Sequence, residues 1–300
     1  MLLSAPATAD DSTPVPRPYQ IAPDAPLDAK QEVVADEDGF TKFRVEFNGI
    51  KGDRVPGFLY VPKNNAATRP AVLLQYGSGG HKGVDYIVSL GRQFVDHGFV
   101  VLTIDSPGRG ERRSKEKRNT DWLFSNEGRE TFLQFLGDYS RAVDLLVSRP
   151  EVDRERIGYV GISWGAITGV TYVAHDPRIK AMCSMVGGGN FLSLAGILGN
   201  GDKTNGNGST NDPKDSKEKP VPIDPVRHVS RIAPRPLLML NVTKDQLVPR
   251  PFAEALHKAA GDGSKIIWLE TDHYFTGVDR DEVGETVIKF MEESLHRKDE

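Results

Sequence analysis

The sequence predicts an α/β protein built on a mostly parallel sheet with helices on both faces. Short apolar runs without polar alternation are typical of strands buried on both faces, and here they alternate with segments of helical periodicity. This alternation is typical of βαβ units, in which crossover helices join parallel strands. The expected strands are 71–76, 99–104, 156–162, 181–186, 236–242 and 265–270, and the expected helices are 84–97, 128–148, 164–174, 251–260 and 281–296.

The chain before residue 71 divides into two parts. Residues 1–35 are rich in Pro, Ala and Asp and lack apolar periodicity, so we expect an extended or flexible arm. The segments 41–49 and 55–63 read as two antiparallel strands, because Gly49 and Gly52 supply turn conformations between them. We therefore expect one domain over residues 36–300.

One region interrupts the alternation of strands and helices. Residues 199–222 are dense in Gly, Asn, Asp, Lys and Ser, so they cannot bury enough apolar surface to order themselves. We expect a mobile insertion here. The sequence leaves open whether it is a neutral surface loop or part of a lid.

The composition excludes several functional classes. A formal net charge of −4 argues against a nucleic-acid partner, which would need a concentrated positive face. The single cysteine, Cys183, cannot form an internal disulfide, and we expect it to pack in the core. Since the chain lacks a Cys/His cluster, we expect no metal site.

The sequence indicates a soluble protein of undetermined location. No stretch approaches the roughly 18 apolar residues that span a bilayer. Ala7-Thr8-Ala9 resembles the end of a signal peptide, but the chain lacks a basic segment and a true apolar segment before it. Export and a cytoplasmic location both stay open, as does the oligomeric state.

Ser163 is the candidate nucleophile. It lies in the pentapeptide GISWG (161–165), which matches G-x-S-x-G and stands between an expected strand and an expected helix. In such a turn the serine is lifted above the sheet, and the residues two before and two after it must be small. The bare pentapeptide is common, but the strand before it and the helix after it make the signal specific.

A serine hydroxyl needs a base and a carboxylate to become nucleophilic. Asp245 and His273 each follow an expected strand, at the sheet edge where α/β proteins collect their site residues. The chain order of serine, aspartate and histidine is the one typical of this kind of fold. Asp272 competes with Asp245, and His81 in a glycine-rich loop competes with His273.

Two backbone N–H groups are expected to hold the oxyanion of a tetrahedral intermediate. The first belongs to Trp164, the residue after the nucleophile, and the second to Ser78 in the loop 76–80, with Gly79 as the alternative. That loop has neither Walker A nor dinucleotide spacing, so we expect no nucleotide cofactor. The aromatic residues near these motifs are candidates for the substrate pocket: Tyr76, Trp122, Phe124, Tyr274 and Phe275.

The motifs QYGSGG, DSPGRGERR, GISWG, KDQLVP and DHYF together resemble the α/β-hydrolase superfamily, near its dienelactone-hydrolase-like and acetylxylan-esterase-like branches. The resemblance covers residues 40–296 and implies an eight-stranded sheet, an esterase mechanism and no cofactor. Ser163 stands where true dienelactone hydrolases use cysteine, which argues against that substrate. Gln75-Tyr76-Gly77 also departs from the His-Gly that is common in relatives.

These observations predict a serine esterase that acts through an acyl-enzyme intermediate. Its expected substrates are small-molecule esters with a short acyl or acetyl group. A peptidase of the oligopeptidase type is the alternative enzyme, since it shares the fold and the motif order. A noncatalytic binding protein on the same fold is the alternative from another class. Which ester is cleaved does not follow from the fold.

Overall fold

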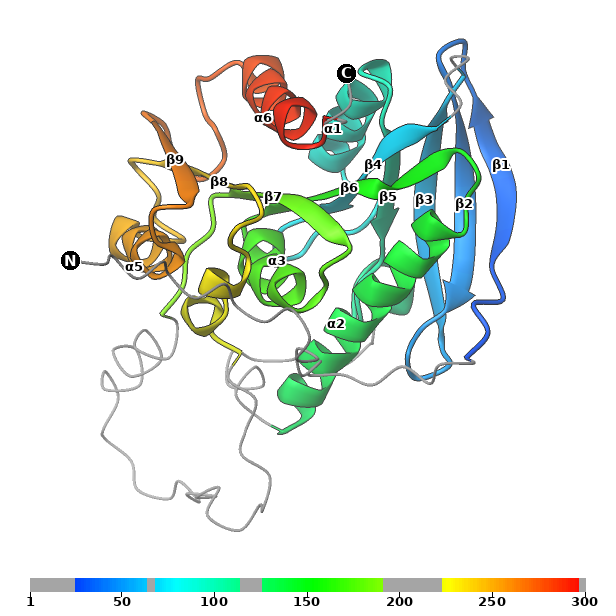
Figure 1. Cartoon of the computed structure of the whole chain (residues 1–300), viewed down its shortest axis with the longest axis horizontal. Coiled ribbons are helices and arrows are strands. Elements are labelled where there is room, and N and C mark those ends of the chain that lie inside the picture. The colour runs from blue at the N-terminus through cyan, green and yellow to red at the C-terminus, as the bar shows by residue number, and fades with distance from the viewer. Residues whose placement is uncertain (1–24, 64–67, 114–125, 191–222, 297–300) are drawn as a thin grey trace, which may run out of the picture.

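A single nine-stranded sheet organises the chain in the computed structural model, which describes residues 25–63, 68–113, 126–190 and 223–296. The strand order is β1-β2-β3-β5-β4-β6-β7-β8-β9 (Figure 1). The strands are β1 (Lys30–Asp36), β2 (Phe40–Asn48), β3 (Arg54–Pro62), β4 (Arg69–Gln75), β5 (Val100–Ile104), β6 (Val152–Ile162), β7 (Ile179–Met185), β8 (Leu237–Val242) and β9 (Ser264–Leu269).

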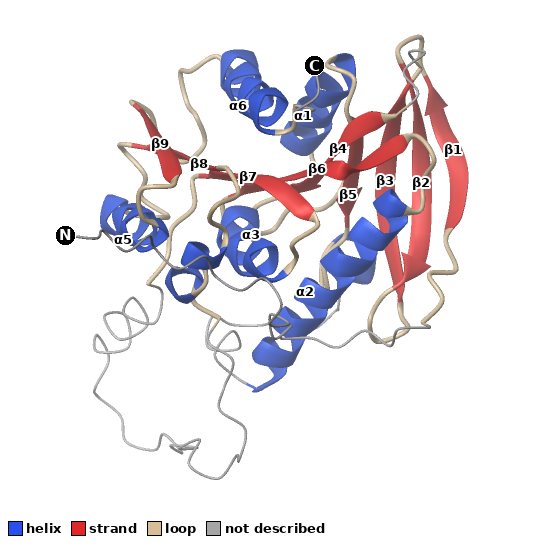
Figure 2. Ribbon diagram, viewed as in Figure 1, coloured by secondary structure: helices blue, strands red, loops and turns tan. Residues whose placement is uncertain are grey.

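Helices cover both faces of the sheet, as predicted. Figure 2 shows α1 and α6 on one face and α2, α3 and α5 on the other. Each face has its own apolar core, in which buried side chains of the sheet pack against those helices. The helices are α1 (Asp85–Asp96), α2 (Asn126–Val147), α3 (Trp164–His175), α5 (Arg250–Ala260) and α6 (Arg280–Ser294).

The expected strands and helices are all present, but the predicted count of eight strands is wrong. The additional strand is β1, which pairs antiparallel with β2 and begins before residue 36, where we expected the domain to start. Every residue of β1 is exposed or only partly buried, so its sequence KQEVVAD carries no alternation of apolar and polar positions. Residues 1–24 and the insertion expected at 199–222 lie outside the described residues.

The arrangement of the sheet determines where a site can form. Strands β4 to β9 run parallel, whereas β1, β2 and β3 form an antiparallel extension beside β5. The chain passes from β4 to β5 on one side and returns to β6 on the other side of β4. Ligands of open α/β sheets bind outside the carboxyl ends of the strands at such a reversal. The loops that follow β4 and β6 are therefore the natural place for a site.

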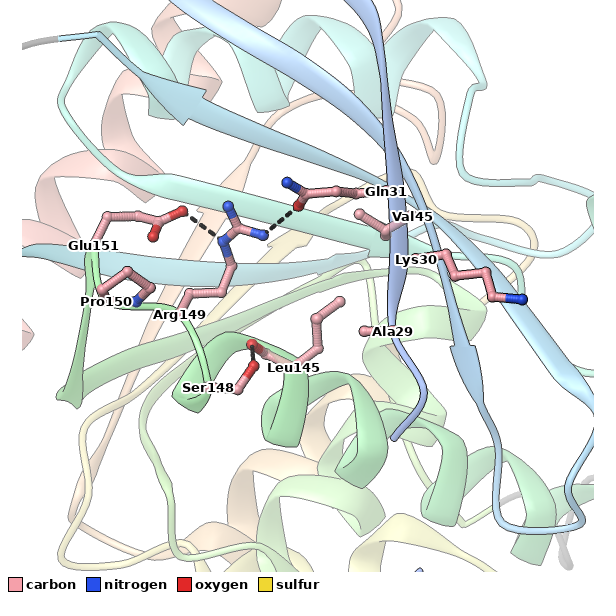
Figure 3. Close-up of a pocket in the computed structure, with 9 residues that line it drawn as sticks. All are labelled: Ala29, Lys30, Gln31, Val45, Leu145, Ser148, Arg149, Pro150 and Glu151. Carbon is pink, nitrogen blue, oxygen red and sulfur yellow. Dashed lines mark hydrogen bonds and ion pairs between the residues drawn. The ribbon is translucent and has the colours of Figure 1, made fainter. Parts of the chain in front are cut away.

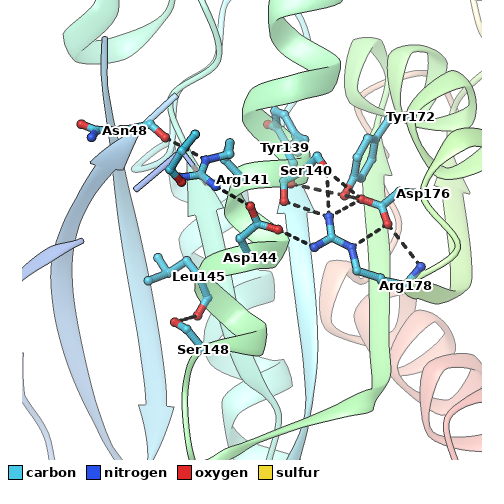
Figure 4. A network of polar contacts seen from close by, with 11 residues as sticks. Asn48, Tyr139, Ser140, Arg141, Asp144, Leu145, Ser148, Tyr172, Asp176 and Arg178 are labelled. Atoms are coloured by element: carbon cyan, nitrogen blue, oxygen red, sulfur yellow. Dashed lines mark hydrogen bonds and ion pairs between the residues drawn. The ribbon is translucent and has the colours of Figure 1, made fainter. Parts of the chain in front are cut away.

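A polar network holds the C-terminal end of α3 against α2 (Figure 4). The guanidinium of Arg178 lies 2.7 Å from the buried carboxylate of Asp176 and 2.5 Å from that of Asp144. Burial alone would raise the pKa of Asp176, but the hydrogen bonds and charge of Arg178 lower it below its usual range. Tyr172 of α3 donates its hydroxyl hydrogen to the same carboxylate. The far end of α3 is thus anchored by a charged pair that stays ionised.

Cys183 is buried in β7, as expected from its apolar neighbours. Burial raises the pKa of its thiol well above the ordinary value, so the side chain stays neutral.

Candidate active site

Ser163 occupies a strained turn between β6 and α3. Its backbone has φ 54° and ψ −114°, in a region that residues with a side chain rarely adopt. The turn is held by the Ser163 N–H, which donates to the carbonyl of Met185 on the neighbouring strand at 2.8 Å. A Cβ atom at Gly165 would lie 2.6 Å from the Gln75 carbonyl oxygen, and one at Gly161 would overlap the backbone of Gly165. The two glycines therefore let strand and helix approach closely.

The structure brings His273 and Asp245 to Ser163. The Nε2 atom of His273 lies 2.9 Å from the Ser163 Oγ atom, and its Nδ1 atom lies 2.7 Å from an Asp245 carboxylate oxygen. An ionised carboxylate only accepts hydrogen bonds, so Nδ1 carries the proton and Nε2 presents its lone pair to the serine hydroxyl. The arrangement is suited to removing a proton from Ser163.

The carboxylate of Asp245 is itself fixed in place. Its second oxygen accepts the backbone N–H groups of Leu247 and Val248 at 2.9 and 2.8 Å. The side chains of Asp245 and His273 are only 2% and 8% exposed, which keeps competing water away from the bond between them. Both residues come from loops that follow neighbouring strands, β8 and β9.

The two competing residues point elsewhere. Asp272 accepts the backbone N–H groups of Thr276 and Tyr274, and these bonds lower the pKa of its carboxyl. It closes its own loop, whereas the two imidazole nitrogens of His273 pair with Asp245 and Ser163. His81 is exposed, and its Nδ1 atom accepts the N–H of Gly83.

The two expected oxyanion donors come from separate elements, the start of α3 and the loop after β4. Trp164 is the first residue of α3, where backbone N–H groups lack partners within the helix. Ser78 lies in a turn closed by the Gly80 N–H, which donates to the Gly77 carbonyl at 3.1 Å, with φ +79° at Gly79. Among the described residues, no acceptor pairs with the N–H of Trp164 or of Ser78.

Gly77 places the Ser78 turn beside Ser163. A Cβ atom at Gly77 would lie only 3.1 Å from the Ser163 Cβ atom. The Gly77 N–H is already bound to the Tyr86 hydroxyl at 2.9 Å, so it is not the group offered to a ligand. The next N–H along the turn belongs to Ser78.

A buried polar chain that sequence reasoning missed fixes the first turn of α3. Gln75 donates to the Thr168 hydroxyl at 3.0 Å, and that hydroxyl donates to the Trp164 carbonyl at 2.8 Å. The Tyr159 hydroxyl donates to the Gly165 carbonyl and also contacts Gln75. The only sequence signal was the presence of polar side chains inside otherwise apolar strands.

The expected pocket residues have different positions. Tyr76 is only 2% exposed, and its hydroxyl accepts the Ser106 N–H at 2.8 Å, so it supports the loop after β5. Burial raises the pKa of Tyr76 to about 12. Tyr274 is 65% exposed, and its ring meets the His273 ring edge-on. Phe275 packs against the core on the α6 face, while Trp122 and Phe124 lie outside the described residues.

A groove of about 260 Å³ lies at another part of the sheet (Figure 3). It is formed by the start of β1, the end of α2 and the segment leading into β6, at the amino ends of the parallel strands. Arg149 lines this groove, and its guanidinium is already bound to Glu151 and Gln31. The one hydroxyl side chain of the groove, Ser148, donates to the Leu145 carbonyl at 2.7 Å, and the groove does not include Ser163, His273 or Asp245.

The described ranges show neither a metal cluster nor a membrane-spanning helix. No three His, Cys, Asp or Glu side chains converge there on a point where a metal ion would bind. No helix in this part of the chain combines the length and the apolar character needed to cross a bilayer.

Fold and site together define an α/β hydrolase, and comparison with solved structures agrees. Acetyl xylan esterase from Paenibacillus sp. R4 superimposes with a TM-score of 0.73 at 21% identity, over 90% of each chain. Acetyl xylan esterase 1 from Thermoanaerobacterium sp. JW/SL YS485 superimposes with a TM-score of 0.67 at 20% identity, over 91% of this chain and 89% of that one.

Sequence comparison gives the family. The profile of the acetyl xylan esterase (AXE1) family matches residues 25–193, more than half of the chain, and the protein belongs to that family. The YtaP protein of Bacillus subtilis is 26% identical over 266 residues, which cover 81% of this chain and 84% of YtaP. This chain is thus a carboxylic ester hydrolase.

The close approach at Gly165 gives a test of the turn geometry. Gly165→Ala should lower the free energy of unfolding by about 2 kcal/mol or more, because its Cβ atom would press on the Gln75 carbonyl. Gly263→Ala is the matched control, since the nearest atom to a Cβ there is 4.0 Å away. Urea denaturation of both variants makes the comparison. Equal stability of the two variants would contradict the crowding described at the turn.

Proposed function

We propose that the protein is a serine esterase that cleaves short-chain acyl esters through a covalent acyl-enzyme. In this proposal Ser163 is the nucleophile, His273 the general base and Asp245 the group that orients the imidazole. The observation that supports it best is the pair of hydrogen bonds at 2.9 and 2.7 Å that join the three side chains.

The first half of the reaction forms the acyl-enzyme. The Ser163 oxygen attacks the ester carbonyl carbon as its proton passes to the Nε2 atom of His273. The resulting imidazolium is stabilised by Asp245, whose carboxylate is held by two backbone N–H groups. The tetrahedral intermediate collapses when the C–O bond to the alcohol breaks, and His273 returns the proton to the leaving oxygen.

The second half releases the acid. His273 takes a proton from a water molecule, whose oxygen attacks the acyl carbon, and the bond to Ser163 breaks as the serine regains its hydrogen. In both halves negative charge develops on the former carbonyl oxygen. We assign its stabilisation to the N–H groups of Trp164 and Ser78. Such donors act because they are in place before the charge appears.

Acetyl and other short acyl esters are the proposed substrates. The support is the family of the chain and its similarity to two solved acetyl xylan esterases. The same family membership and structural similarity favour ester cleavage over peptide cleavage. An acetylated carbohydrate is one member of this class, and a panel of esters with varied acyl length and alcohol would define the preference.

Substitutions in the three side chains test the mechanism. Ser163→Ala should lower kcat on p-nitrophenyl acetate by about 10⁴-fold or more, and Asp245→Asn should lower it by about 10⁴-fold through the wrong imidazole tautomer. Asp272→Asn is the control, because the hydrogen bonds that Asp272 accepts in the described part of the chain come from its own loop. Its kcat should stay near that of the wild type. An Asp272→Asn variant as impaired as Asp245→Asn would refute the assignment.

A second pair of variants tests the Ser78 backbone group. Ser78→Pro removes the backbone N–H. Proline fits the fold at this position, because Ser78 is the second residue of a turn whose third residue, Gly79, has φ +79°. The substitution should lower kcat by about 10²- to 10³-fold. Ser78→Ala keeps the N–H and should behave like the wild type. Equal losses in the two variants would show that the side chain, and not the backbone, is what matters.

A further inference from the structure

Lys82 is a buried lysine at the end of the loop that carries Ser78. Its side chain is 6% exposed, and its Nζ atom lies 2.7 Å from Asp105 and 2.5 Å from Glu111. The Phe58 ring lies beneath the ammonium, 5.0 Å from its centroid. A buried ammonium is tolerated only when it is paired, so these contacts hold the lysine in one position.

Asp105 binds both the side chain and the backbone of Lys82. The carboxylate follows β5 and is fully buried, and one of its oxygens accepts the Lys82 backbone N–H at 3.0 Å. The other oxygen receives the Lys82 ammonium and also the N–H of Glu111 at 2.9 Å. Gly110 allows this approach, since a Cβ atom there would overlap the Asp105 carboxylate. One carboxylate thus fastens the loop after β4 to the loop after β5.

The loop that contains the Ser78 turn is held by hydrogen bonds at both of its ends. At its start, the Gly77 N–H is bound to the Tyr86 hydroxyl. At its end, Lys82 is bound to Asp105. Ser78 and Gly79 between these points are exposed, and a Cβ atom at Gly79 would meet nothing within 4 Å. The direction of the Ser78 N–H therefore depends on the two ends of the loop.

We propose that Lys82 is a positioning residue for catalysis, because its ion pair with Asp105 holds the Ser78 N–H in line with the oxyanion. The inference rests on the proposed serine esterase function and goes beyond it, since the described contacts of Lys82 are to Asp105, Glu111 and Phe58 and not to the three reacting side chains. Asp105 is the partner through which Lys82 acts.

Glu111 supplies a control inside the same cluster. It bonds to Arg44 at 2.6 Å as well as to Lys82, and the Arg44 bond lowers the pKa of its carboxyl. Glu111→Gln removes one charge but leaves both bonds between Lys82 and Asp105. It separates loss of charge in the cluster from loss of the loop anchor.

The experiment compares Lys82→Met, Lys82→Arg, Glu111→Gln and Arg178→Met. Arg178→Met breaks a pair of comparable geometry at the far end of α3 and controls for stability alone. Lys82→Met should lower kcat on p-nitrophenyl acetate by about 10- to 100-fold, with little change in KM. This loss is smaller than that for complete removal of an oxyanion donor, because the Ser78 N–H is displaced and not absent. The affinity of Lys82→Met for a boronic acid that mimics the tetrahedral intermediate should fall by the same factor.

The controls should lose thermal stability without losing turnover. Glu111→Gln and Arg178→Met should lower Tm and keep kcat near the wild-type value. Lys82→Arg, which retains the charge, should recover most of the kcat lost in Lys82→Met. If Lys82→Met does not fold, Asp105→Asn takes its place, since it weakens the same anchor and keeps an acceptor for the Lys82 N–H.

A double variant tests whether Lys82 acts through Ser78. Ser78→Pro combined with Lys82→Met should be no slower than Ser78→Pro alone, because the group that Lys82 positions is already absent. Multiplied losses, or a Lys82→Met kcat equal to that of Arg178→Met, would overturn the inference. An active Ser163→Ala variant would instead overturn the proposed function. The two failures are therefore distinguishable.

Discussion

The site depends on one strained backbone turn. Ser163 has φ 54°, a conformation that costs about 1–3 kcal/mol for a residue with a side chain. The strained conformation is maintained by the hydrogen bond from the Ser163 N–H to the Met185 carbonyl on β7. It also needs the close approach of strand and helix that Gly161 and Gly165 allow. The same turn directs the serine oxygen toward His273 and begins α3 at Trp164. The proposed nucleophile and the first proposed oxyanion donor are consequently placed by the same turn.

Much of this could be predicted from the sequence, because the signals are local. The parallel strands are buried on both faces, so they appear as continuous apolar runs, and strand, G-x-S-x-G and helix follow one another directly. Asp245 and His273 each follow a strand, and the carboxyl ends of parallel strands meet at one edge. The fold class and the convergence of three distant side chains follow from these patterns together.

The features that the sequence did not reveal depend on contacts between distant residues. Strand β1 was missed because it lies exposed at the sheet edge and needs no apolar face. Tyr76 looked like a pocket residue from its place beside the loop, whereas its hydroxyl is turned inward to Ser106. The burial of Lys82 has no signal in the sequence, because its partner Asp105 comes from another loop. Burial of a polar side chain is set by its partner, which a single sequence does not name.

In the proposed mechanism Ser163 forms the covalent bond to the acyl group. The most direct measurement is mass spectrometry of the full-length protein after reaction with a fluorophosphonate, followed by peptide mapping. We expect one equivalent of label, located on Ser163, and a loss of esterase activity in proportion to labelling. Full esterase activity in a completely labelled protein, or a label mapped to another residue, would contradict this mechanism.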